Sequence, residues 1–256
     1  MKSQTFNSGK TILALSIILS TIIFIAACSK SSNPSPTPTT GTAYVSVTNA
    51  SPTATSYGVY SDTTNIYTNG TLGYGYTTGV AGGNPYSTVT SGNHSIKLMS
   101  GGNSVFLDSN GTFANGGYYS FFVYDTGNQV KTLALNDNLT PPASGSAEVR
   151  FLNLSPNSQS LNVWLINADT TTKDSVSLSS IPYTGSSVAN TDSLSSFKTI
   201  TAGTYKVLLN SNVELNLFQN DSVAFANGKI YTIYAKGYVN GINGADSLGL
   251  GIIQNY

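Results

Sequence analysis

Residues 43–60 read AYVSVTNASPTATSYGVY, and residues 147–164 repeat their pattern as AEVRFLNLSPNSQSLNVW. Aligned without gaps, both stretches begin with alanine and share a valine at the third position and another near the end. Both also contain Asn-x-Ser-Pro, at Asn49–Pro52 and at Asn153–Pro156. The two stretches lie about a hundred residues apart, which is the size of one domain. The sequence therefore predicts two copies of one module.

Two further blocks occur in both copies and in the same order. Tyr86–Gly92 (YSTVTSG) reappears as Phe197–Gly203 (FKTITAG), and Phe113–Gly116 (FANG) reappears unchanged as Phe225–Gly228. The spacing differs slightly between the copies, as expected when loops take up insertions at little cost. Matched positions that alternate along a strand predict its buried face. The predicted core residues are Val45, Val59, Val89, Ile96, Tyr119, Phe121, Val149, Val163, Ile200, Val207, Tyr231 and Ile233.

The composition and the turn signals favour strands over helices. The chain has 16 Tyr and only 9% charged residues, so its polar surface consists mostly of Ser, Thr, Asn and Gly. Pairs such as Asn115-Gly116 favour tight hairpins, because both residues accept a positive φ. Short strands between such turns are typical of sandwiches. We expect an all-β fold of two tandem immunoglobulin-like antiparallel β-sandwich domains, at residues 42–140 and 147–256, joined by a linker at 141–146.

The N-terminal residues predict a lipoprotein signal peptide over residues 1–27. Lys2 and Lys10 precede an apolar run that ends in Ile-Ala-Ala-Cys at Cys28. A basic segment, a short apolar segment and small residues before the cleavage point describe a secretory signal, and the run is short for a membrane span. The last four residues resemble the lipobox of bacterial lipoproteins, which implies acylation of Cys28. An ordinary signal peptide that contains cysteine, or an uncleaved helix, is the alternative interpretation.

Residues 28–41 predict an acylated cysteine followed by a disordered tether rich in Pro, Ser and Thr. The tether has no apolar residue with which to build a core. Two or more acyl chains give stable membrane anchoring, so the membrane is the expected partner, through the lipid on Cys28. Ser29 resembles the sorting pattern of outer-membrane lipoproteins. We expect a lipid-anchored protein of the cell envelope, at the outer membrane, and the sequence leaves its periplasmic or outward orientation open.

Charge and cysteine content argue against several classes of function. The formal net charge is zero and no basic patch occurs, so nucleic acid is not an expected partner. Cys28 is the only cysteine and His94 the only histidine, which excludes zinc sites with the usual set of His and Cys ligands. The run at residues 136–138 (Asn-Asp-Asn) lacks the further acidic ligands of a calcium loop. We expect a turn there, no metal and no cofactor.

Nothing in the sequence predicts a catalytic residue. Nucleophilic catalysis needs a base beside Ser, Thr or Cys, and His94 is the only imidazole. His94 lies in a predicted strand, and the second copy has Tyr205 at the matching position, which indicates a packing role for the ring. No hydrolase or nucleotide-binding motif occurs. We expect that the protein is not an enzyme. Two carboxylates distant in the sequence can nevertheless meet in a folded chain and act together in hydrolysis.

Together, the matched blocks resemble the family known as domain of unknown function (DUF) 4397. The family pattern is similar to the Ala-x-Val opening with Asn-x-Ser-Pro and to the aromatic blocks that begin at Tyr86 and Phe197. It is also similar to Gly-x-x-Tyr-Thr, which the second copy carries at residues 228–232. The resemblance covers nearly all of residues 43–256. It implies tandem immunoglobulin-like sandwiches in envelope or secreted proteins, and it supplies no activity and no catalytic residue.

Two sets of residues are candidates for modification or binding. Asp followed by Ser and an aliphatic residue resembles the acceptor of periplasmic O-glycosylation in some Gram-negative bacteria, although Asp and Ser also favour turns. The candidate acceptors are Ser175, Ser193, Ser222 and Ser247. Aromatic side chains near Asn and Thr suit sugar binding, although aromatic pairs also stabilise ordinary sheets. The candidate ligand-stacking residues are Tyr74, Tyr76, Phe122 and Tyr124.

Three hypotheses for the function follow. The leading one is a non-catalytic, lipid-anchored envelope protein with a structural, adhesive or scaffolding role, because repeated modules follow an anchor and no catalytic site is evident. The second is a surface lipoprotein that binds a glycan through its aromatic side chains. Besides the membrane, the candidate partners are thus a glycan or an envelope protein. The third is a hydrolase with an unrecognised carboxylate pair.

Overall fold

The computed structural model describes most of the chain after the predicted tether. The described ranges are residues 41–52, 56–79, 83–100, 104–126, 129–169, 175–186, 190–241 and 247–256. The predicted signal peptide, Cys28 and all of the tether except Gly41 lie outside the described residues. We call residues 42–137 the first half and residues 146–256 the second half.

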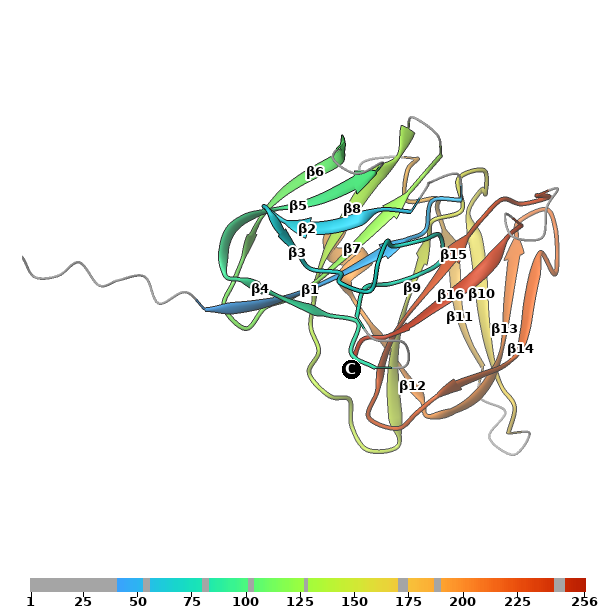
Figure 1. Ribbon diagram of the computed structural model, residues 1–256. Coiled ribbons are helices and arrows are strands. Elements are labelled where there is room, and N and C mark those ends of the chain that lie inside the picture. The colour runs from blue at the N-terminus through green and yellow to red at the C-terminus, as the bar shows by residue number, and fades with distance from the viewer. Residues whose placement is uncertain are drawn as a thin grey trace, which may run out of the picture. The chain divides into compact units, whose positions relative to one another are not determined.

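The first half contains two four-stranded sheets. Its strands are β1 (Thr42–Asn49), β2 (Gly58–Ser61), β3 (Thr64–Asn65), β4 (Ser87–Thr90), β5 (Gly92–Ser100), β6 (Ser104–Phe113), β7 (Tyr118–Tyr124) and β8 (Lys131–Asp137). One sheet has the order β4-β1-β7-β8 and the other the order β3-β2-β5-β6 (Figure 1).

The second half contains two more four-stranded sheets. Its strands are β9 (Ser146–Asn153), β10 (Leu161–Asn167), β11 (Ser175–Ile181), β12 (Lys198–Thr201), β13 (Gly203–Ser211), β14 (Phe218–Phe225), β15 (Ile230–Lys236) and β16 (Gly249–Gln254), with the short helix α1 (Thr191–Ser195) before β12. The sheet orders are β12-β9-β15-β16 and β11-β10-β13-β14, so the strands of both halves are arranged in the same order.

The all-β fold class is confirmed, with one difference in strand direction. Most neighbouring strands are antiparallel, as predicted. However, β1 pairs with β7 in parallel, and β9 pairs with β15 in parallel. A parallel pair cannot be joined by a tight hairpin. After β1 the chain forms β2 and β3 in the opposite sheet, returns to the edge of the first sheet with β4, and crosses again for β5 and β6 before it reaches β7, and the second half follows the same path from β9 to β15.

Each half has its own apolar core between its two sheets. All the predicted core residues are buried except Tyr119, which is half-buried and packs against the core of the first half. The prediction from matched, alternating positions is therefore confirmed. Alternation works here because one face of each strand points between the two sheets of its sandwich.

Both copies of Asn-x-Ser-Pro form the same buried turn. Asn49 Oδ1 accepts a hydrogen bond from the backbone N–H of Ser51 at 3.2 Å, and Asn153 Oδ1 accepts one from that of Ser155 at 3.3 Å. The serine hydroxyls donate to backbone carbonyls just beyond β7 and just beyond β15, at 2.6 and 2.7 Å. All four side chains are fully buried. The motif therefore fastens the end of each half's first strand to the end of its parallel neighbour.

A third apolar cluster joins the two halves. Phe122, Tyr124 and three smaller apolar residues of the first half pack with Leu152, Leu154, Tyr234 and Ile253 of the second. The rings of Phe122 and Tyr234 meet edge to face, with their centroids 6.0 Å apart. The predicted ligand-stacking role of Phe122 and Tyr124 is therefore wrong, because these side chains are 0% and 5% exposed and face the other half.

A buried ion pair lies in the same contact between the halves. Arg150 Nη1 of β9 lies 2.6 Å from Asp137 Oδ1 of β8, and both side chains are almost completely buried. The hydroxyls of Tyr86 and Ser120 donate to the other carboxylate oxygen of Asp137, at 2.7 and 2.6 Å. Burial, followed by the Asp137 charge, raises the pKa of the Tyr86 hydroxyl, so it stays protonated and keeps donating.

The polar network continues on the side of the second half. Arg150 Nε donates to Thr232 Oγ1 at 2.8 Å, and Thr232 donates to Asn255 at 2.7 Å. Asn255 Nδ2 donates to the Tyr86 hydroxyl at 2.9 Å, which connects the network back to the first half. The guanidinium of Arg150 also lies over the ring of Phe197, 4.6 Å from its centroid. The guanidinium of Arg150 thus interacts with Asp137 of the first half and with Thr232 and Phe197 of the second.

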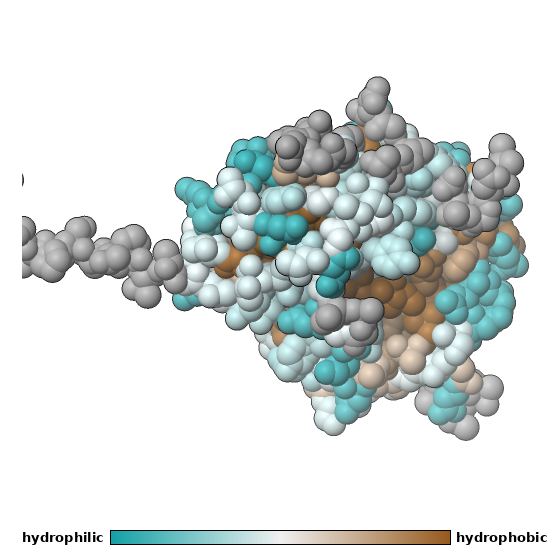
Figure 2. Space-filling view, in the orientation of Figure 1, coloured by the Kyte–Doolittle hydropathy of each residue, from teal (hydrophilic) through white to brown (hydrophobic). Residues whose placement is uncertain are grey.

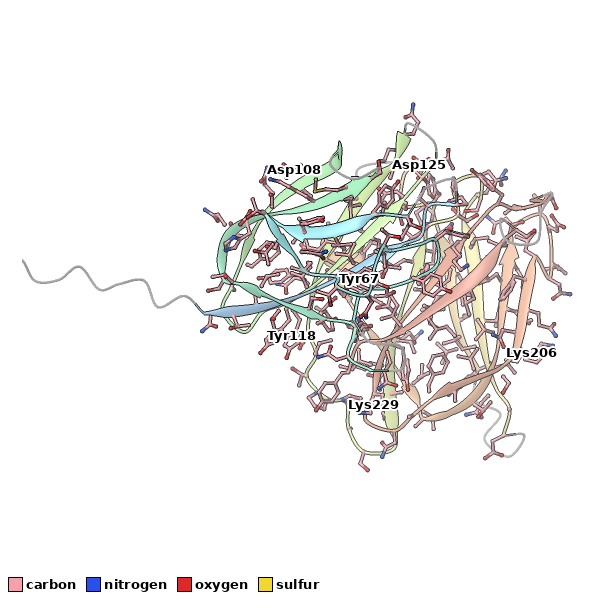
Figure 3. All side chains as sticks on the ribbon, viewed as in Figure 1. Tyr67, Asp108, Tyr118, Asp125, Lys206 and Lys229 are labelled. Atoms are coloured by element: carbon pink, nitrogen blue, oxygen red, sulfur yellow. The ribbon has the colours of Figure 1, made fainter. Side chains whose placement is uncertain are left out.

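We expect Arg150→Met to destabilise the protein by about 3–5 kcal/mol, because it leaves the Asp137 carboxylate buried without its counter-charge. Chemical denaturation followed by tyrosine fluorescence measures this change. Lys206→Met is the matched control, because it breaks an exposed ion pair with Asp221 on β14, away from the contact between the halves (Figure 3). The control should lose less than about 1 kcal/mol. Equal losses for the two variants would contradict the importance of the buried pair.

Candidate functional site

The imidazole of His94 lies on β5 beside the turn that joins β2 to β3. Its Nδ1 is 2.6 Å from Asp62 Oδ2. The other carboxylate oxygen of Asp62 accepts a hydrogen bond from the backbone N–H of Ser95 at 2.9 Å. Asp62 has a φ of 52°, in the left-handed region, which Asp tolerates better than most residues. The hydrogen bonds to Ser95 and His94 hold the side chain of Asp62 in this turn.

The pair favours the charged form of both side chains. The hydrogen bond from the Ser95 backbone and then the bond to His94 lower the pKa of Asp62. The hydrogen bond to Asp62 raises the pKa of His94, and the nearby Ser91 carbonyl acts in the same direction. His94 Nε2 lies 3.4 Å from that carbonyl. Both ring nitrogens therefore face hydrogen-bond acceptors, which suits an imidazolium ion better than a general base.

The structure supports a packing role for the ring of His94. The ring stacks on Phe113, with centroids 6.5 Å apart and 20° between the planes. The matching residue of the second half, Tyr205, packs against Phe225 at 5.6 Å, and its hydroxyl donates to the carbonyl of Thr201. Both rings thus contact a phenylalanine and a carbonyl near the preceding turn. They differ in burial, because Tyr205 is fully buried whereas 21% of the His94 side chain is exposed.

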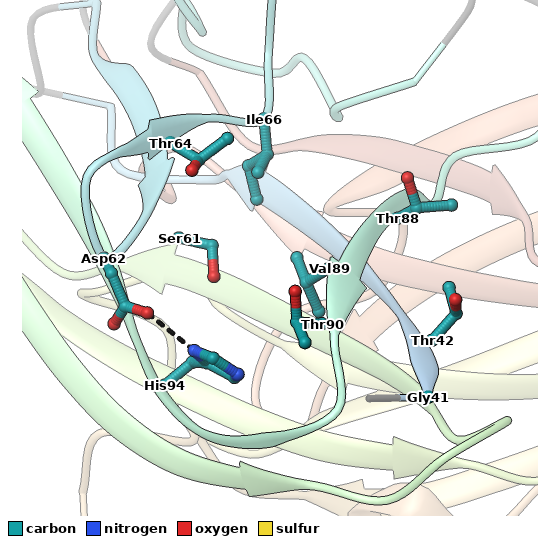
Figure 4. A pocket seen from close by; sticks show the side chains of 10 residues that line it. All are labelled: Gly41, Thr42, Ser61, Asp62, Thr64, Ile66, Thr88, Val89, Thr90 and His94. Atoms are coloured by element: carbon teal, nitrogen blue, oxygen red, sulfur yellow. Dashed lines mark hydrogen bonds and ion pairs between the residues drawn. The ribbon is translucent and has the colours of Figure 1, made fainter. Parts of the chain in front are cut away.

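Two hollows meet at the pair formed by Asp62 and His94. The first has a volume of about 350 Å³. Figure 4 shows the contact between Asp62 and His94 at one side of this pocket and Thr88 and Thr90 of β4 at the other. Its lining residues are Gly41, Thr42, Ser61, Asp62, Thr64, Ile66, Thr88, Val89, Thr90 and His94. The second hollow, of about 490 Å³, is lined by Asp62, Asn93, His94, Ser95, Asn110, Gly111 and Thr112.

The remaining candidate stacking residues lie in the Tyr-rich segment before β4. Tyr76 is 67% exposed. Tyr74 is half-buried, and the ammonium of Lys236, from the second half, lies 4.4 Å from its ring centroid. This cation–π contact occupies one face of Tyr74. Of the four predicted stacking residues, Tyr76 is the one whose ring is largely open to solvent.

The predicted acceptor serines differ in accessibility. Ser175 begins β11, Ser193 lies in α1 and Ser222 lies in β14, and all three are exposed. Ser247 is half-buried and its hydroxyl donates to the carbonyl of Gly241 at 3.2 Å. Glycosylation at these serines stays a prediction.

Two further findings concern the described part of the chain. Its residues contain no group of three or more His, Cys, Asp or Glu side chains that could hold a metal ion. No helix in the same part is long and apolar enough to cross a membrane. The turn predicted at residues 136–138 is wrong, because residues 136 and 137 are the last two of β8 and the carboxylate of Asp137 belongs to the buried network between the halves.

Sequence reasoning missed Asp62, Asp137 and Arg150. Asp62 is 32 residues away from its partner His94, and its neighbours in the sequence carry no motif. Arg150 had one signal, which was a charged residue between Val149 and Phe151 in the apolar middle of the strand AEVRFLN. Such a residue at a strand centre indicates a buried partner, because an unpaired charge there is costly.

The sequence profile of a domain of unknown function, DUF4397, matches residues 43–164. The match supports the resemblance to the DUF4397 family over this segment. It begins in β1 and ends within β10, so it covers the first half and the opening strands of the second. The resemblance was expected over nearly all of residues 43–256, and the match is shorter than that. The family description carries no activity, so the function of this protein is argued from its own residues.

The other comparisons add little. No curated protein matches the chain. A crystal structure of a leucine-rich repeat protein from Bacteroides thetaiotaomicron VPI-5482 matches with 15% identity over 75% of this chain and 25% of that chain, at a TM-score of 0.21. The chain therefore spans a quarter of the length of that protein. A TM-score this low supports no conclusion about fold or function.

We expect the imidazole of His94 to titrate above the usual histidine range, and Asp62→Asn to lower that pKa. Because the folded pKa is raised, the bond to Asp62 stabilises the fold fully below the unfolded pKa of about 6.5, and this stabilisation is lost as the pH rises through the folded pKa. His94 is the only histidine, so its ring resonances in a proton NMR titration are unambiguous. An unchanged pKa of His94 in Asp62→Asn would refute the coupling. Asp108→Asn on β6 is the matched control and should leave the pKa of His94 unchanged.

Proposed function

We propose that this protein is a non-catalytic, lipid-anchored component of the cell envelope with a structural, adhesive or scaffolding role. In this proposal its body is a tandem pair of one β-sandwich module. The contact between the halves is the observation that carries the proposal. Contacts between domains of one chain usually permit relative motion unless they are large and apolar. Here an apolar cluster and a buried ion pair join the halves, which suits a rigid body that holds a partner at a fixed place.

The anchor in this proposal is an acylated Cys28 at the outer membrane. The residues between Cys28 and β1 are rich in proline and polar side chains, so they can extend at about 3 Å per residue and hold the body roughly 40 Å from the bilayer. The role needs the membrane as a partner and, beyond it, a glycan or an envelope protein. It requires neither nucleic acid nor a cofactor, and it is compatible with either face of the outer membrane.

Cys28→Ala should move the protein from the membrane fraction to the soluble fraction, because it removes the site of acylation. Cell fractionation with immunoblotting measures this shift, and mass spectrometry of the wild-type N-terminal peptide should find acyl chains on Cys28. Ser29→Ala, which keeps the thiol, is the control and should stay in the membrane fraction. Wild-type protein recovered in the soluble fraction with an unmodified thiol would overturn the proposal.

Modification of the exposed serines is a separate expectation. Ser222, which follows Asp221 on the edge strand β14, is exposed and has a valine after it, as the acceptor pattern requires. If it is glycosylated, Ser222→Ala should lower the intact mass of the native protein by one glycan in addition to one oxygen. Ser247→Ala is the comparison, because its half-buried hydroxyl already bonds to a carbonyl. A native mass equal to that of the bare acylated chain would remove the idea.

Glycan binding is the second candidate function, and one observation favours it. The two hollows beside His94 are lined mainly by hydroxyl and amide side chains rather than by charges of one sign. Such groups both donate and accept hydrogen bonds, as sugar hydroxyls do.

A further inference from the structure

The two hollows share Asp62 and His94, so they are neighbours along one surface of the first half. The first hollow lies between the turn after β2 and the strand β4. The second lies over the paired strands β5 and β6, next to the same turn. The pair of charged side chains separates them. Their volumes, about 350 and 490 Å³, are each within the range of small-molecule sites.

The side chains of the first hollow are prepared for a polar ligand. Thr88 and Thr90 are exposed on β4, and their hydroxyls make no hydrogen bond with any of the described residues. Ile66 adds apolar surface to the lining, whereas Val89, on the opposite face of β4 from the two threonines, is largely buried in the core. Hydroxyls beside small apolar patches match a sugar ring, which presents hydroxyls at its edge and C–H groups on its faces.

The electrostatics argue against a charged ligand. None of the described residues that line the two hollows is a Lys or an Arg, so among them an anion would find only His94, whose charge Asp62 already balances. A cation would find only Asp62, which already accepts hydrogen bonds from Ser95 and His94. In the view of Figure 2, the left part of the surface, where Figure 1 places the strands of the first half, is mostly hydrophilic to neutral, whereas a larger hydrophobic area lies right of the centre. A neutral, hydroxyl-rich ligand fits these groups best.

We propose that the two hollows form one groove that binds a neutral oligosaccharide, with the pair of Asp62 and His94 between successive sugar units. This inference rests on the second candidate function and deepens it, because it names the site and the minimum length of the ligand. Because the hollows lie on the two sides of the pair, a ligand of two or more units that spans both gains contacts on each side. A single sugar reaches only one side.

The second half does not repeat the pair formed by Asp62 and His94. At the place of His94 it has the fully buried Tyr205, whose hydroxyl donates to a backbone carbonyl. Because the proposed groove needs this pair, we expect one bound oligosaccharide per chain. Thr201, which occupies in β12 the place of Thr90 in β4, is exposed and its hydroxyl has no partner among the described residues, so it provides a matched control.

The experiment titrates the detergent-solubilised full chain with four neutral trisaccharides (maltotriose, cellotriose, mannotriose and N,N′,N″-triacetylchitotriose) and with their monosaccharides. The ring resonance of His94, the single histidine, reports on the groove, and calorimetry gives the stoichiometry. We expect at least one trisaccharide to shift this resonance saturably at one site per chain, with at least tenfold higher affinity than its monosaccharide. Thr90→Val should weaken binding about fivefold, because it removes one hydrogen bond. Thr201→Val should leave the affinity unchanged.

Each other outcome counts against the inference in a distinct way. Saturable binding that leaves the His94 resonance in place and ignores Thr90→Val overturns the groove but supports glycan binding elsewhere on the protein. Equal affinity for the trisaccharide and the monosaccharide overturns the use of both hollows. If none of the sugars binds, both the groove and the second candidate function are refuted. The proposed envelope role is tested separately, by Cys28→Ala. Valine retains the strand preference of threonine, and equal melting temperatures of the two variants verify that both are folded.

Discussion

The pairing of Asp137 with Arg150 is the constraint on which the arrangement of the two halves depends. Two charges removed from water are stable together only when each has its counter-charge and its hydrogen bonds in place. Here the carboxylate receives two hydroxyls and the guanidinium, while the guanidinium also bonds to Thr232 and lies over Phe197. A slip of one half against the other breaks several of these contacts at once. The apolar cluster around Phe122 and Tyr234 supplies attraction, and the polar network selects one relative position.

Much of the fold could be predicted from the sequence, because each half builds its core from residues on one face of its strands. The matched blocks identified Val45 and Val149, or Ile96 and Val207, as core positions, and all four are buried. The contact between the halves was missed for a physical reason. Antiparallel sheets often leave one face to solvent. The prediction that Phe122 and Tyr124 stack on a ligand assumes that the second face of β7 is exposed in this way. Its run YYSFFVY carries apolar residues on both faces, which is the signal of a strand covered on both sides.

Less of the candidate site could be predicted, because the site is assembled from separate turns and strands. The comparison with Tyr205 correctly indicated that the ring of His94 packs against its surroundings. It gave no information on Asp62, which reaches the imidazole from a turn with a positive φ. Sequence patterns describe faces of single strands, whereas hollows form where different strands and turns meet. Thr88 and Thr90 line a hollow because β4 lies opposite that turn in the folded chain, and this proximity cannot be inferred from the sequence of β4 alone.

The two sides of the contact between the halves carry different groups at corresponding places. Ser46 in β1 corresponds to Arg150 in β9, the strand at the same place of the second half. Asp137 at the end of β8 corresponds to Asn255, which follows β16. Two first halves brought together in this way would set an acidic group against Ser46, and two second halves would set a basic group against Asn255. Either pairing of like with like would leave a buried charge without compensation. The charges at this contact therefore favour the pairing of a first half with a second half. They disfavour the pairing of two identical halves from neighbouring molecules.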